Sequence, residues 1–431
     1  MITTTAMIVL AASFIVLILL RFPIAMVLAL SSLLTAITLD IPLAVIGQRM
    51  IQGMNSYSLL AIPFFILAGQ IMSEGGLALR LINLAQLTVG AIRGGLAMVN
   101  CVACMLFGNI SGSAAADVSS VGSVMIPMMK KKNYDADYSV AVTSAAAIQG
   151  VVMPPSHNMI LYALAAGGVS ISSLFLAGIV PCLVLLVSLM TTSYFIARKR
   201  GYAKGEPVQL KEVPKILRDG FLSMMTGVII LGGIFTGWFT ATEAGAIACV
   251  YAFILTFFIY RDIPLSRVKV IFTRTFRTVA MVLFLISASN AFAWILTYLK
   301  IPTMLTNMLL GISDEPFIIL LIINVLLLVL GAPLDMAPLI LIMTPILFPV
   351  VTALGMDPVH FGIVLILNLG IGLITPPVGT VLFVGCAIGK VTIEQGTKAL
   401  IPFFIVMVAV LMLITYVPSI SMWLPNLVNG S

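Results

Sequence analysis

The sequence predicts an all-α protein that crosses a membrane many times, and its composition supports this in three ways. The chain has 431 residues, of which 61% are hydrophobic and only 9% are charged, and its mean hydropathy is +1.20. A water-soluble domain carries about 25% charged residues, so a chain with so few charges could not cover its surface in water. The apolar runs are too long for barrel strands. The composition therefore excludes soluble enzymes, nucleic-acid-binding proteins and disordered scaffolds.

Apolar segments long enough to cross a bilayer, which takes about 20 residues, recur along the whole chain. The first has no cationic start and no small-residue cleavage site, so we expect a transmembrane helix and not a removable signal peptide. Ten segments are expected to span the membrane: 5–20, 22–39, 57–74, 136–166, 172–196, 219–238, 241–260, 278–299, 359–389 and 400–417. Two of them, 136–166 and 359–389, are too long for one crossing and contain a Pro-Pro pair, which predicts two broken helices.

Two further apolar stretches, 96–129 and 316–350, are interrupted at their centres by polar and turn residues. The interruptions read GNISGSAAAD and GAPLD. We expect each stretch to form a re-entrant helical hairpin with its tip inside the membrane. Irregular backbone at that depth is tolerated only where protein buries it or where it lines a cavity. The two tips and the two Pro-Pro breaks therefore predict where the functional site lies.

Basic residues gather in a few short segments, which we expect to face the cytoplasm because positive charge favours that side. These segments are Lys130–Lys132, seven residues between Arg198 and Arg218, and five between Arg261 and Arg277. This constraint places both termini on the outer face and opens the two hairpins to opposite sides. The net charge of +7 is therefore a sign of membrane topology and not of nucleic-acid binding.

Internal similarity at one fixed offset of 222 residues, the distance from Asp40 to Asp262, indicates a duplication. At this offset Asp40-Ile41-Pro42-Leu43 recurs as Asp262-Ile263-Pro264-Leu265. The same offset pairs Pro127 with Pro349, Asp135 with Asp357, Gly150 with Gly372, and Pro154-Pro155 with Pro376-Pro377. Since the two halves are expected to lie in opposite orientations, the sequence predicts an inverted-topology repeat, which is typical of secondary transporters.

The predicted organisation has six parts. They are a first transmembrane helix (1–21), a first inverted repeat (22–197) with hairpin 96–129, a basic cytoplasmic loop (198–218), a linking transmembrane helix (219–240), a second inverted repeat (241–417) with hairpin 316–350, and a C-terminal tail (418–431). Two amphipathic stretches, Pro42–Met54 and Arg261–Arg277, occupy matching positions in the repeats. We expect them to lie on the membrane surface as arms that hold a moving domain.

The tips and breaks offer hydroxyl and carbonyl oxygens. In the first half, the tip at 109–113 is expected to face the break at 150–156, and in the second half the tip at 331–335 is expected to face 372–379. Hard oxygen ligands without thiolate or imidazole suit an alkali cation, and the N–H groups at the start of a half-helix suit an anion. The competing interpretation is that the small residues only allow tight helix packing.

Two acidic residues, Asp117 and Asp335, fall within predicted membrane segments. A charged residue at the centre of a membrane helix costs about 2.5–3.5 kcal/mol on insertion scales, so each needs a reason. Asp335 lies at a tip, where a carboxylate could help to hold a cation, whereas Asp117 lies one turn past its tip and could instead satisfy nearby groups. Glu243 is expected to cap a helix. His157 could line the cavity, either as a proton relay or as a satisfied histidine.

Five stretches follow one another along the chain: GNISGSAAADVSSVG (108–122), GVVMPPS (150–156), FTATEAGA (239–246), GAPLDMAPLILIMTPILFP (331–349) and NLGIGLITPPVGTVLF (368–383). In this order they resemble the large, DctM-like membrane subunit of a TRAP (tripartite ATP-independent periplasmic) transporter, of the ion transporter superfamily. The resemblance covers nearly the whole chain. It implies a bacterial inner-membrane permease that imports an organic acid anion, such as a dicarboxylate or a sugar acid, by an elevator mechanism driven by two Na⁺ ions. It also implies two partners, a small four-helix membrane subunit on a separate chain and a periplasmic substrate-binding protein.

The resemblance also implies roles for individual residues. Substrate-binding positions would be Ser111, Gly112, Ser113, Pro155, Ser156 and Pro377. Na⁺-binding positions would be Gly108, Asn109, Ser111 and Ser113 in the first half, and Gly331, Asp335, Thr375 and Gly379 in the second.

Three other functions compete with this one. A self-sufficient ion-coupled carrier or antiporter could use the same hairpins, and nothing in the chain excludes it. An intramembrane serine hydrolase could pair Ser111 with His157, but the Gly-x-Ser spacing of rhomboid-type proteases is missing. An ATP-driven pump would need a Walker A lysine motif, which is absent. We therefore expect a transporter and not an enzyme.

Overall fold

The computed structural model describes residues 2–205, 208–313 and 315–429, and its secondary structure is helical throughout. Within these ranges no β-strand forms, and one isolated bridge joins Arg93 to Lys204. The prediction of an all-α fold is confirmed. Residue 1 of the predicted first helix, residues 206–207 of the basic loop and residues 430–431 of the predicted tail lie outside the described residues.

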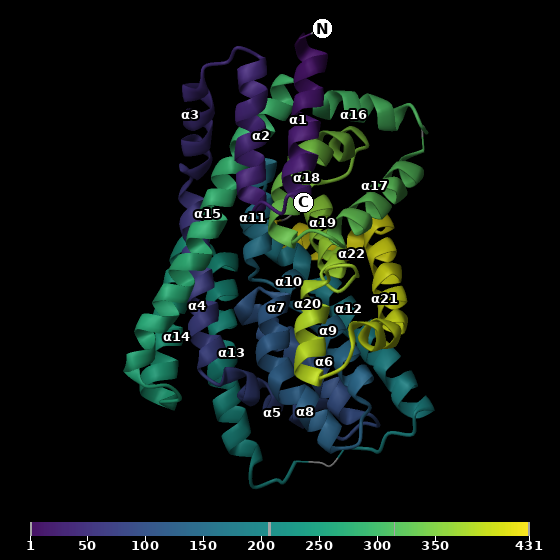
Figure 1. Cartoon of the computed structure of the whole chain (residues 1–431). Coiled ribbons are helices and arrows are strands. Elements are labelled where there is room, and N and C mark those ends of the chain that lie inside the picture. The colour runs from purple at the N-terminus through teal and green to yellow at the C-terminus, as the bar shows by residue number, and fades with distance from the viewer. Residues whose placement is uncertain (1, 206–207, 314, 430–431) are drawn as a thin grey trace.

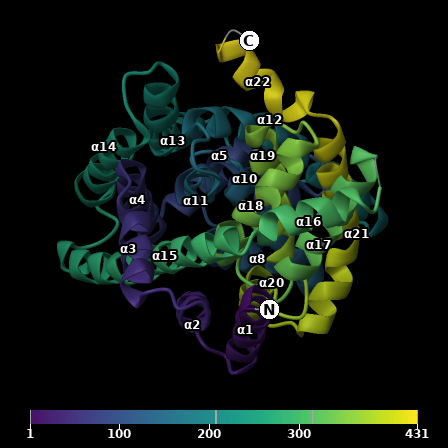
Figure 2. The ribbon, with the colours of Figure 1, turned by 90° about the horizontal axis from the view of Figure 1, so that it is seen from above.

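The helices form two groups that lie side by side in Figures 1 and 2. The peripheral group packs around the long helix α15, which contacts α2, α3 and α4, and most of it lies toward the left of both views, with α1 nearer the middle. Its helices are α1 (Ile2–Leu19), α2 (Ile24–Thr38), α3 (Leu43–Met54), α4 (Ala61–Glu74), α13 (Val213–Phe235), α14 (Ala241–Ile254) and α15 (Val268–Tyr298).

The central group contains the predicted hairpins and broken helices of both halves. From the first half come α6 (Gly95–Ser111), α7 (Ala114–Asp117), α8 (Ser123–Lys131), α9 (Ala136–Ala147), α10 (Gln149–Val152), α11 (His157–Ala166) and α12 (Ile171–Lys199). From the second half come α17 (Pro316–Gly331), α18 (Met336–Ala353), α19 (Pro358–Gly372), α20 (Thr380–Gly389), α21 (Ile393–Tyr416) and α22 (Ser419–Asn429). Figure 1 shows α6 and α8 in the lower part of the molecule and α17 and α18 in the upper part.

Shorter elements connect these groups. Helix α5 (Leu77–Val89) packs against both α6 and α13, and α16 (Ile301–Leu310) leads from α15 to α17 and packs on α18. Two 3₁₀ turns, Tyr57–Leu60 and Leu265–Arg267, and two π-helical turns, Val118–Gly122 and Leu255–Tyr260, complete the described elements.

Seven described helices are long and apolar enough to cross a membrane, against the ten spans that the sequence predicts. They are Tyr57–Glu74, Ile171–Lys199, Val213–Phe235, Ala241–Tyr260, Leu265–Tyr298, Met336–Ala353 and Ile393–Tyr416. The two Pro-Pro segments fall short because each break divides its span into shorter helices, such as Pro358–Gly372 and Thr380–Gly389. Helix α18, predicted as one arm of a re-entrant hairpin, is by its 18 residues long enough to cross.

Local sequence accounts for several helix ends. Thr240 and Glu243 form a capping box at the start of α14, which confirms the capping role predicted for Glu243. Thr392 and Gln395 form a second one at the start of α21. Helix α6 ends at Gly112, whose φ of +60° is a left-handed conformation that glycine adopts without the steric penalty of a Cβ.

The structure differs from the expected elements in one place and adds two helices that were not expected. The stretch Arg261–Arg277 is no separate arm, because a 3₁₀ turn leads directly into α15, which is one helix of 31 residues. The predicted C-terminal tail contains α22, which packs on α12. Helix α5, which the sequence analysis did not predict, occupies Leu77–Val89. The matching stretch Pro42–Met54 does contain a separate helix, α3.

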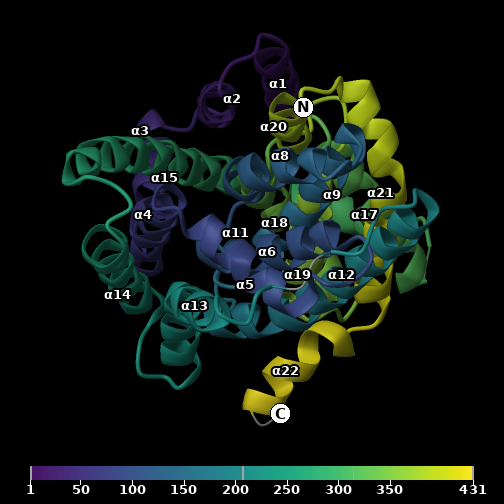
Figure 3. The same ribbon diagram turned by 90° about the horizontal axis from the view of Figure 1, so that it is seen from below.

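The end of the molecule seen in Figure 3 holds the basic segments that follow α8 and α12. There Asp135 precedes α9 and accepts hydrogen bonds from the Tyr202 hydroxyl and from Arg200 Nη1, both at 2.7 Å. These two bonds lower the pKa of Asp135 below its usual value. The contacts fix the loop after α12 against the start of a broken helix.

Candidate functional site

The first hairpin tip docks on the first Pro-Pro break. The space beside Gly112 is filled by the break, since a Cβ added to Gly112 would lie 3.2 Å from His157 Nδ1 and 3.4 Å from the Pro155 carbonyl oxygen. The Asn158 amide donates a hydrogen bond to the Gly112 carbonyl at 3.4 Å. The break itself, between α10 and α11, leaves the chain non-helical from Met153 to Ser156. The structure thus brings together the tip and break residues that the sequence placed in one site.

Below the tip, α6 and α10 approach so closely that only glycine fits at the crossing. A Cβ on Gly108 would overlap the Cα of Gly150, and its distance to the Gly150 nitrogen would be 3.0 Å. A Cβ closer than 3.0 Å to the backbone of the other helix would force the two helices apart. The Gly108 carbonyl accepts the Gly112 amide at 2.8 Å, so its oxygen is already used within the helix end.

Asp117 lies at this crossing and is the only acidic residue with a fully buried side chain in the described part of the chain. One carboxylate oxygen, Oδ1, accepts a hydrogen bond from the Ser111 hydroxyl. The other, Oδ2, would lie 3.1 Å from a Cβ on Gly108 and has no hydrogen-bond partner among the described residues. A buried carboxylate with a free oxygen is costly unless a positive charge or a proton joins it. The arrangement can therefore hold a small cation.

The serines near the tip contribute further oxygens. Ser111 Oγ accepts the Ser113 amide at 3.2 Å, and Ser113 Oγ accepts the Ala116 amide at 3.4 Å as the N-cap of α7. Ser156 is fully buried at the break, and its hydroxyl has no partner in the described ranges. A substrate oxygen or a cation could complete the bonding of this hydroxyl.

Asn109 has a different environment from the other tip residues. Its side chain packs against α13, because a Cβ on Gly227 would lie 2.8 Å from Asn109 Cγ and 2.9 Å from Nδ2. Asn109 and Gly227 line a cavity of about 260 Å³ between α6 and α13. The structure thus places this predicted Na⁺ ligand at the contact with the peripheral group.

The second half repeats the glycine crossing with a different set of side chains. A Cβ on Gly372 would lie 2.7 Å from the Gly331 carbonyl carbon and oxygen, so the end of α17 meets the end of α19. The break runs from Leu373 to Gly379, and Gly379 precedes α20 with a φ of +43°. Tip and break therefore adjoin in the second half as well.

The predicted second cation ligands are less closely gathered. Asp335 precedes α18, its side chain is exposed, and it makes no capping bond to a described residue. The Thr375 hydroxyl donates to the Ile371 carbonyl at 2.8 Å, and Thr375 lines a cavity of about 180 Å³ against α21. Pro377 is exposed. No hydrogen bond joins the side chains of Asp335 and Thr375 in the described part of the chain.

Asp117 is the main residue of the site that is missing from the predicted binding positions. The sequence also allows Asp117 only to satisfy neighbouring groups, and its bond to Ser111 is of that kind. The other oxygen, Oδ2, has no partner among the described residues, so satisfying neighbouring groups does not account for the whole carboxylate. The signal in the sequence was the spacing itself, since Asp117 follows Ser111 by six residues and the reversal at Gly112 brings them together.

Comparison with known proteins gives consistent matches over nearly the full length. A family model described as the tripartite ATP-independent periplasmic transporter, DctM component, matches residues 11–420. The chain is 44% identical to the uncharacterized protein YgiK of Salmonella typhimurium, over 97% of both chains. It is 40% identical to the sialic acid TRAP transporter large permease protein SiaM of Vibrio cholerae, over 89% of this chain and 90% of the relative.

A third relative and one solved structure extend the comparison. The chain is 37% identical to the C4-dicarboxylate TRAP transporter large permease protein DctM of Rhodobacter capsulatus, over 94% of this chain and 96% of the relative. The crystal structure of the YdaH transporter of Alcanivorax borkumensis superposes with a TM-score of 0.61 over 87% of each chain, at 13% identity. That likeness shows a shared fold.

Proposed function

The chain belongs to the family of DctM components of tripartite ATP-independent periplasmic (TRAP) transporters, and on that basis we propose that it imports a small organic anion across the bacterial inner membrane, driven by Na⁺. The observation that carries the proposal is the buried Asp117 carboxylate at the contact between the first tip and the first break. A coupled transporter needs a site for its driving ion beside its substrate site. The tip supplies both kinds of group within a few residues.

The proposed substrate is an organic acid anion. Relatives are named for sialic acid, for C4-dicarboxylate and for 2,3-diketo-L-gulonate, which are all organic acids. The residues proposed to contact the substrate are Ser111, Gly112, Ser113, Pro155, Ser156 and Pro377. Among them, the buried Ser156 hydroxyl without a described partner gives the strongest support.

The proposed first Na⁺ site is built around Ser111 and Asp117. Carboxylate and hydroxyl oxygens are the ligands that hard cations prefer, and Asp117 has a free oxygen to offer. Ser113, Gly108 and Asn109 remain candidates from the sequence; Asn109 Oδ1 is buried without a described partner but lies against α13, and the Gly108 carbonyl already accepts the Gly112 amide. The proposed second site uses Asp335, Gly331, Thr375 and Gly379, and its ligands would have to draw together when the ion enters.

The proposed mechanism is an elevator in which the central group moves across the membrane against the peripheral group. It rests on an inverted repeat, and the paired glycine crossings, Gly108 with Gly150 and Gly331 with Gly372, support equivalent roles for the two halves. The first arms of the hairpins, α6 and α17, have 17 and 16 residues. At 1.5 Å per residue they reach about 25 Å, less than the roughly 30 Å hydrocarbon core, so length supports a turn inside the membrane for these first arms, whereas α18 is long enough to cross.

The proposed partners are a small four-helix membrane subunit and a periplasmic substrate-binding protein. The family description calls the transporter tripartite and periplasmic, which supports two further components. In this arrangement the multi-pass chain lies in the inner membrane with both termini outside. The alternative is a self-sufficient ion-coupled carrier or antiporter, which would transport its substrate without these two partners.

Uptake into proteoliposomes separates these two functions. With the purified chain alone, we expect accumulation of a labelled C4-dicarboxylate or sialic acid at the level of empty vesicles. With the small subunit, the binding protein and an inward Na⁺ gradient, we expect concentrative uptake, because the binding protein captures the substrate. Concentrative uptake by the chain alone would establish the carrier function instead.

A further inference from the structure

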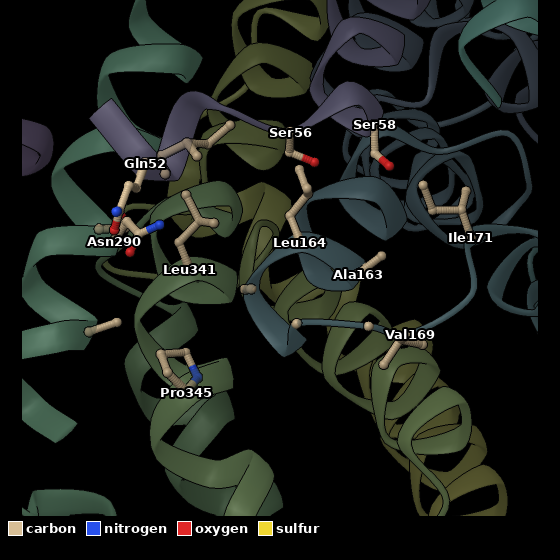
Figure 4. A pocket seen from close by; sticks show the side chains of 17 residues that line it. Gln52, Ser56, Ser58, Ala163, Leu164, Val169, Ile171, Asn290, Leu341 and Pro345 are labelled. Carbon is tan, nitrogen blue, oxygen red and sulfur yellow. The ribbon is translucent and has the colours of Figure 1, made fainter. Parts of the chain in front are cut away.

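One cavity shares no lining residue with either tip and lies between the two helix groups. Its volume is about 530 Å³, within the range of small-molecule sites. Figure 4 shows Gln52, Asn290 and Leu341 on one side of it, Val169 and Ile171 on the other, and Ser56 and Leu164 between them. The peripheral group contributes α3, the turn after it and α15, and the central group contributes the end of α11, the start of α12 and α18.

The lining is polar but uncharged. Hydroxyl and amide side chains come from Gln52, Ser56, Ser58, Ser289 and Asn290, and none of the described lining residues carries a charge. Apolar side chains, among them Leu164 and Leu341, supply the rest of the wall. Uncharged hydrogen-bonding groups beside an apolar wall match a molecule that has hydroxyls on its rim and a C–H face, such as a pyranose ring.

The hydroxyl of Ser289 indicates that the cavity binds a ligand. This residue is 4% exposed, and its hydroxyl has no hydrogen-bond partner among the residues that the structure describes. A buried hydroxyl without a partner loses the hydrogen bonds that it would make in water, which is costly unless a ligand or water replaces them. Two residues earlier on α15, Ser287 is equally buried, but its hydroxyl donates to the Met50 carbonyl at 3.0 Å and it does not line the cavity. The two serines therefore form a matched pair, one satisfied and one not.

We propose that this cavity is a second ligand site, distinct from the tip site, that binds a neutral, hydroxyl-rich molecule of about monosaccharide size. Gly167 and Gly168, which lie between α11 and α12, also line the cavity, and an added Cβ at either would meet open space. No lining residue among those described carries a charge to pair with an anion, and the nearby Arg49 guanidinium donates to the Gln52 side chain at 3.2 Å. Both helix groups line the site, so its shape depends on how the groups lie relative to each other. A bound ligand would therefore hold the two groups in the arrangement that the structure describes.

The binding experiment uses the full chain in lipid nanodiscs, without partner proteins. Saturation-transfer NMR measures the affinity of methyl α-D-glucopyranoside and, for comparison, of glucuronate, which adds a carboxylate to a similar ring. We expect the neutral glycoside to bind and glucuronate to bind more weakly. Failure of the glycoside to bind, or tighter binding of glucuronate, would overturn the proposal.

Variants of the paired serines locate the site. Ser289→Ala should weaken glycoside binding about three- to tenfold, the effect of one hydrogen bond, without lowering thermal stability. Ser287→Ala should leave binding unchanged and lower stability, because it removes a satisfied bond. Ala293→Leu, which fills the cavity from α15, should abolish binding. Unchanged affinity in both Ser289→Ala and Ala293→Leu would place any bound glycoside elsewhere and contradict the proposal.

A second measurement concerns the effect on transport and rests on the proposed function. In the reconstituted three-component system the glycoside should slow anion uptake, and Ala293→Leu should remove this inhibition. Binding without inhibition would leave the second site in place and contradict only its role in holding the two helix groups. The binding test does not depend on uptake, so the two failures can be told apart.

Discussion

Replacing Asp117 by asparagine is expected to raise the Na⁺ concentration needed for half-maximal uptake about 10- to 100-fold. The reason is that asparagine keeps the shape and can still accept the Ser111 hydroxyl, but it offers the ion no negative charge. Contacts to a charged group are worth about 1.5–3 kcal/mol, and every 1.4 kcal/mol is about tenfold in affinity. The measurement is uptake against external Na⁺ in the reconstituted three-component system, with a size-exclusion profile to confirm folding.

Asp335→Asn is the matched comparison, since Asp335 also lies at a predicted tip but is exposed. The Asp335 carboxylate makes no hydrogen bond to a described residue. We therefore expect the Na⁺ concentration for half-maximal uptake to rise by less in Asp335→Asn than in Asp117→Asn. A wild-type midpoint in Asp117→Asn would make Asp117 a packing residue and move the first cation site elsewhere. A larger effect of Asp335→Asn would make the second tip the dominant ion site.

Gly150→Ala is expected to destabilise the protein by about 1–3 kcal/mol or more, the usual cost of overpacking. The added Cβ would overlap the Asp117 carboxylate, with the carboxyl carbon 2.9 Å away, and would lie 3.1 Å from the Gly108 Cα. Backbone and a buried carboxylate cannot move aside as a flexible side-chain end can. The expected result is a lower thermal unfolding temperature in detergent and reduced uptake.

The control for this prediction is Gly47→Ala on α3, where an added Cβ meets nothing within 4 Å. Alanine is favoured over glycine inside a helix by about 1 kcal/mol, so Gly47→Ala should keep or raise stability. Both substitutions replace glycine by alanine, but Gly150→Ala should lower the unfolding temperature whereas Gly47→Ala should keep or raise it. Equal unfolding temperatures would mean that α6 and α10 do not cross as closely as the structure describes.

The sequence predicted those features that local chemistry determines. The helix breaks follow from proline, which lacks an N–H, at Pro154-Pro155 and Pro376-Pro377, and the structure has both breaks where they were expected. The reversal at Gly112 follows from its left-handed backbone, and the start of α14 follows from the Thr240–Glu243 capping box. Each of these signals depends on residues that adjoin in the chain.

Features that depend on packing were not predictable in this way. The apolar pattern of 261–277 fits a separate surface helix and also the first turns of α15, and only the neighbouring helices decide between them. The tip motif does not predict that the Asn109 side chain faces Gly227 on α13, because this depends on the rotation of α6 about its own axis. The burial of Asp117 likewise depends on the Gly108–Gly150 crossing, which joins segments about 40 residues apart.

The central claim is that the two halves of the chain are inserted in opposite orientations. Lys131 and Ala353 test it well, because each is the last residue of the second arm of its hairpin, they lie at the repeat offset of 222 residues, and both are exposed. The five native cysteines are buried, which keeps background labelling low. Lys131→Cys and Ala353→Cys are each treated with a membrane-impermeant maleimide, in intact cells and in inside-out vesicles. We expect Ala353→Cys to react from outside and Lys131→Cys only from the cytoplasmic face. Labelling of both from the same face would contradict the inverted repeat and the transport mechanism built on it.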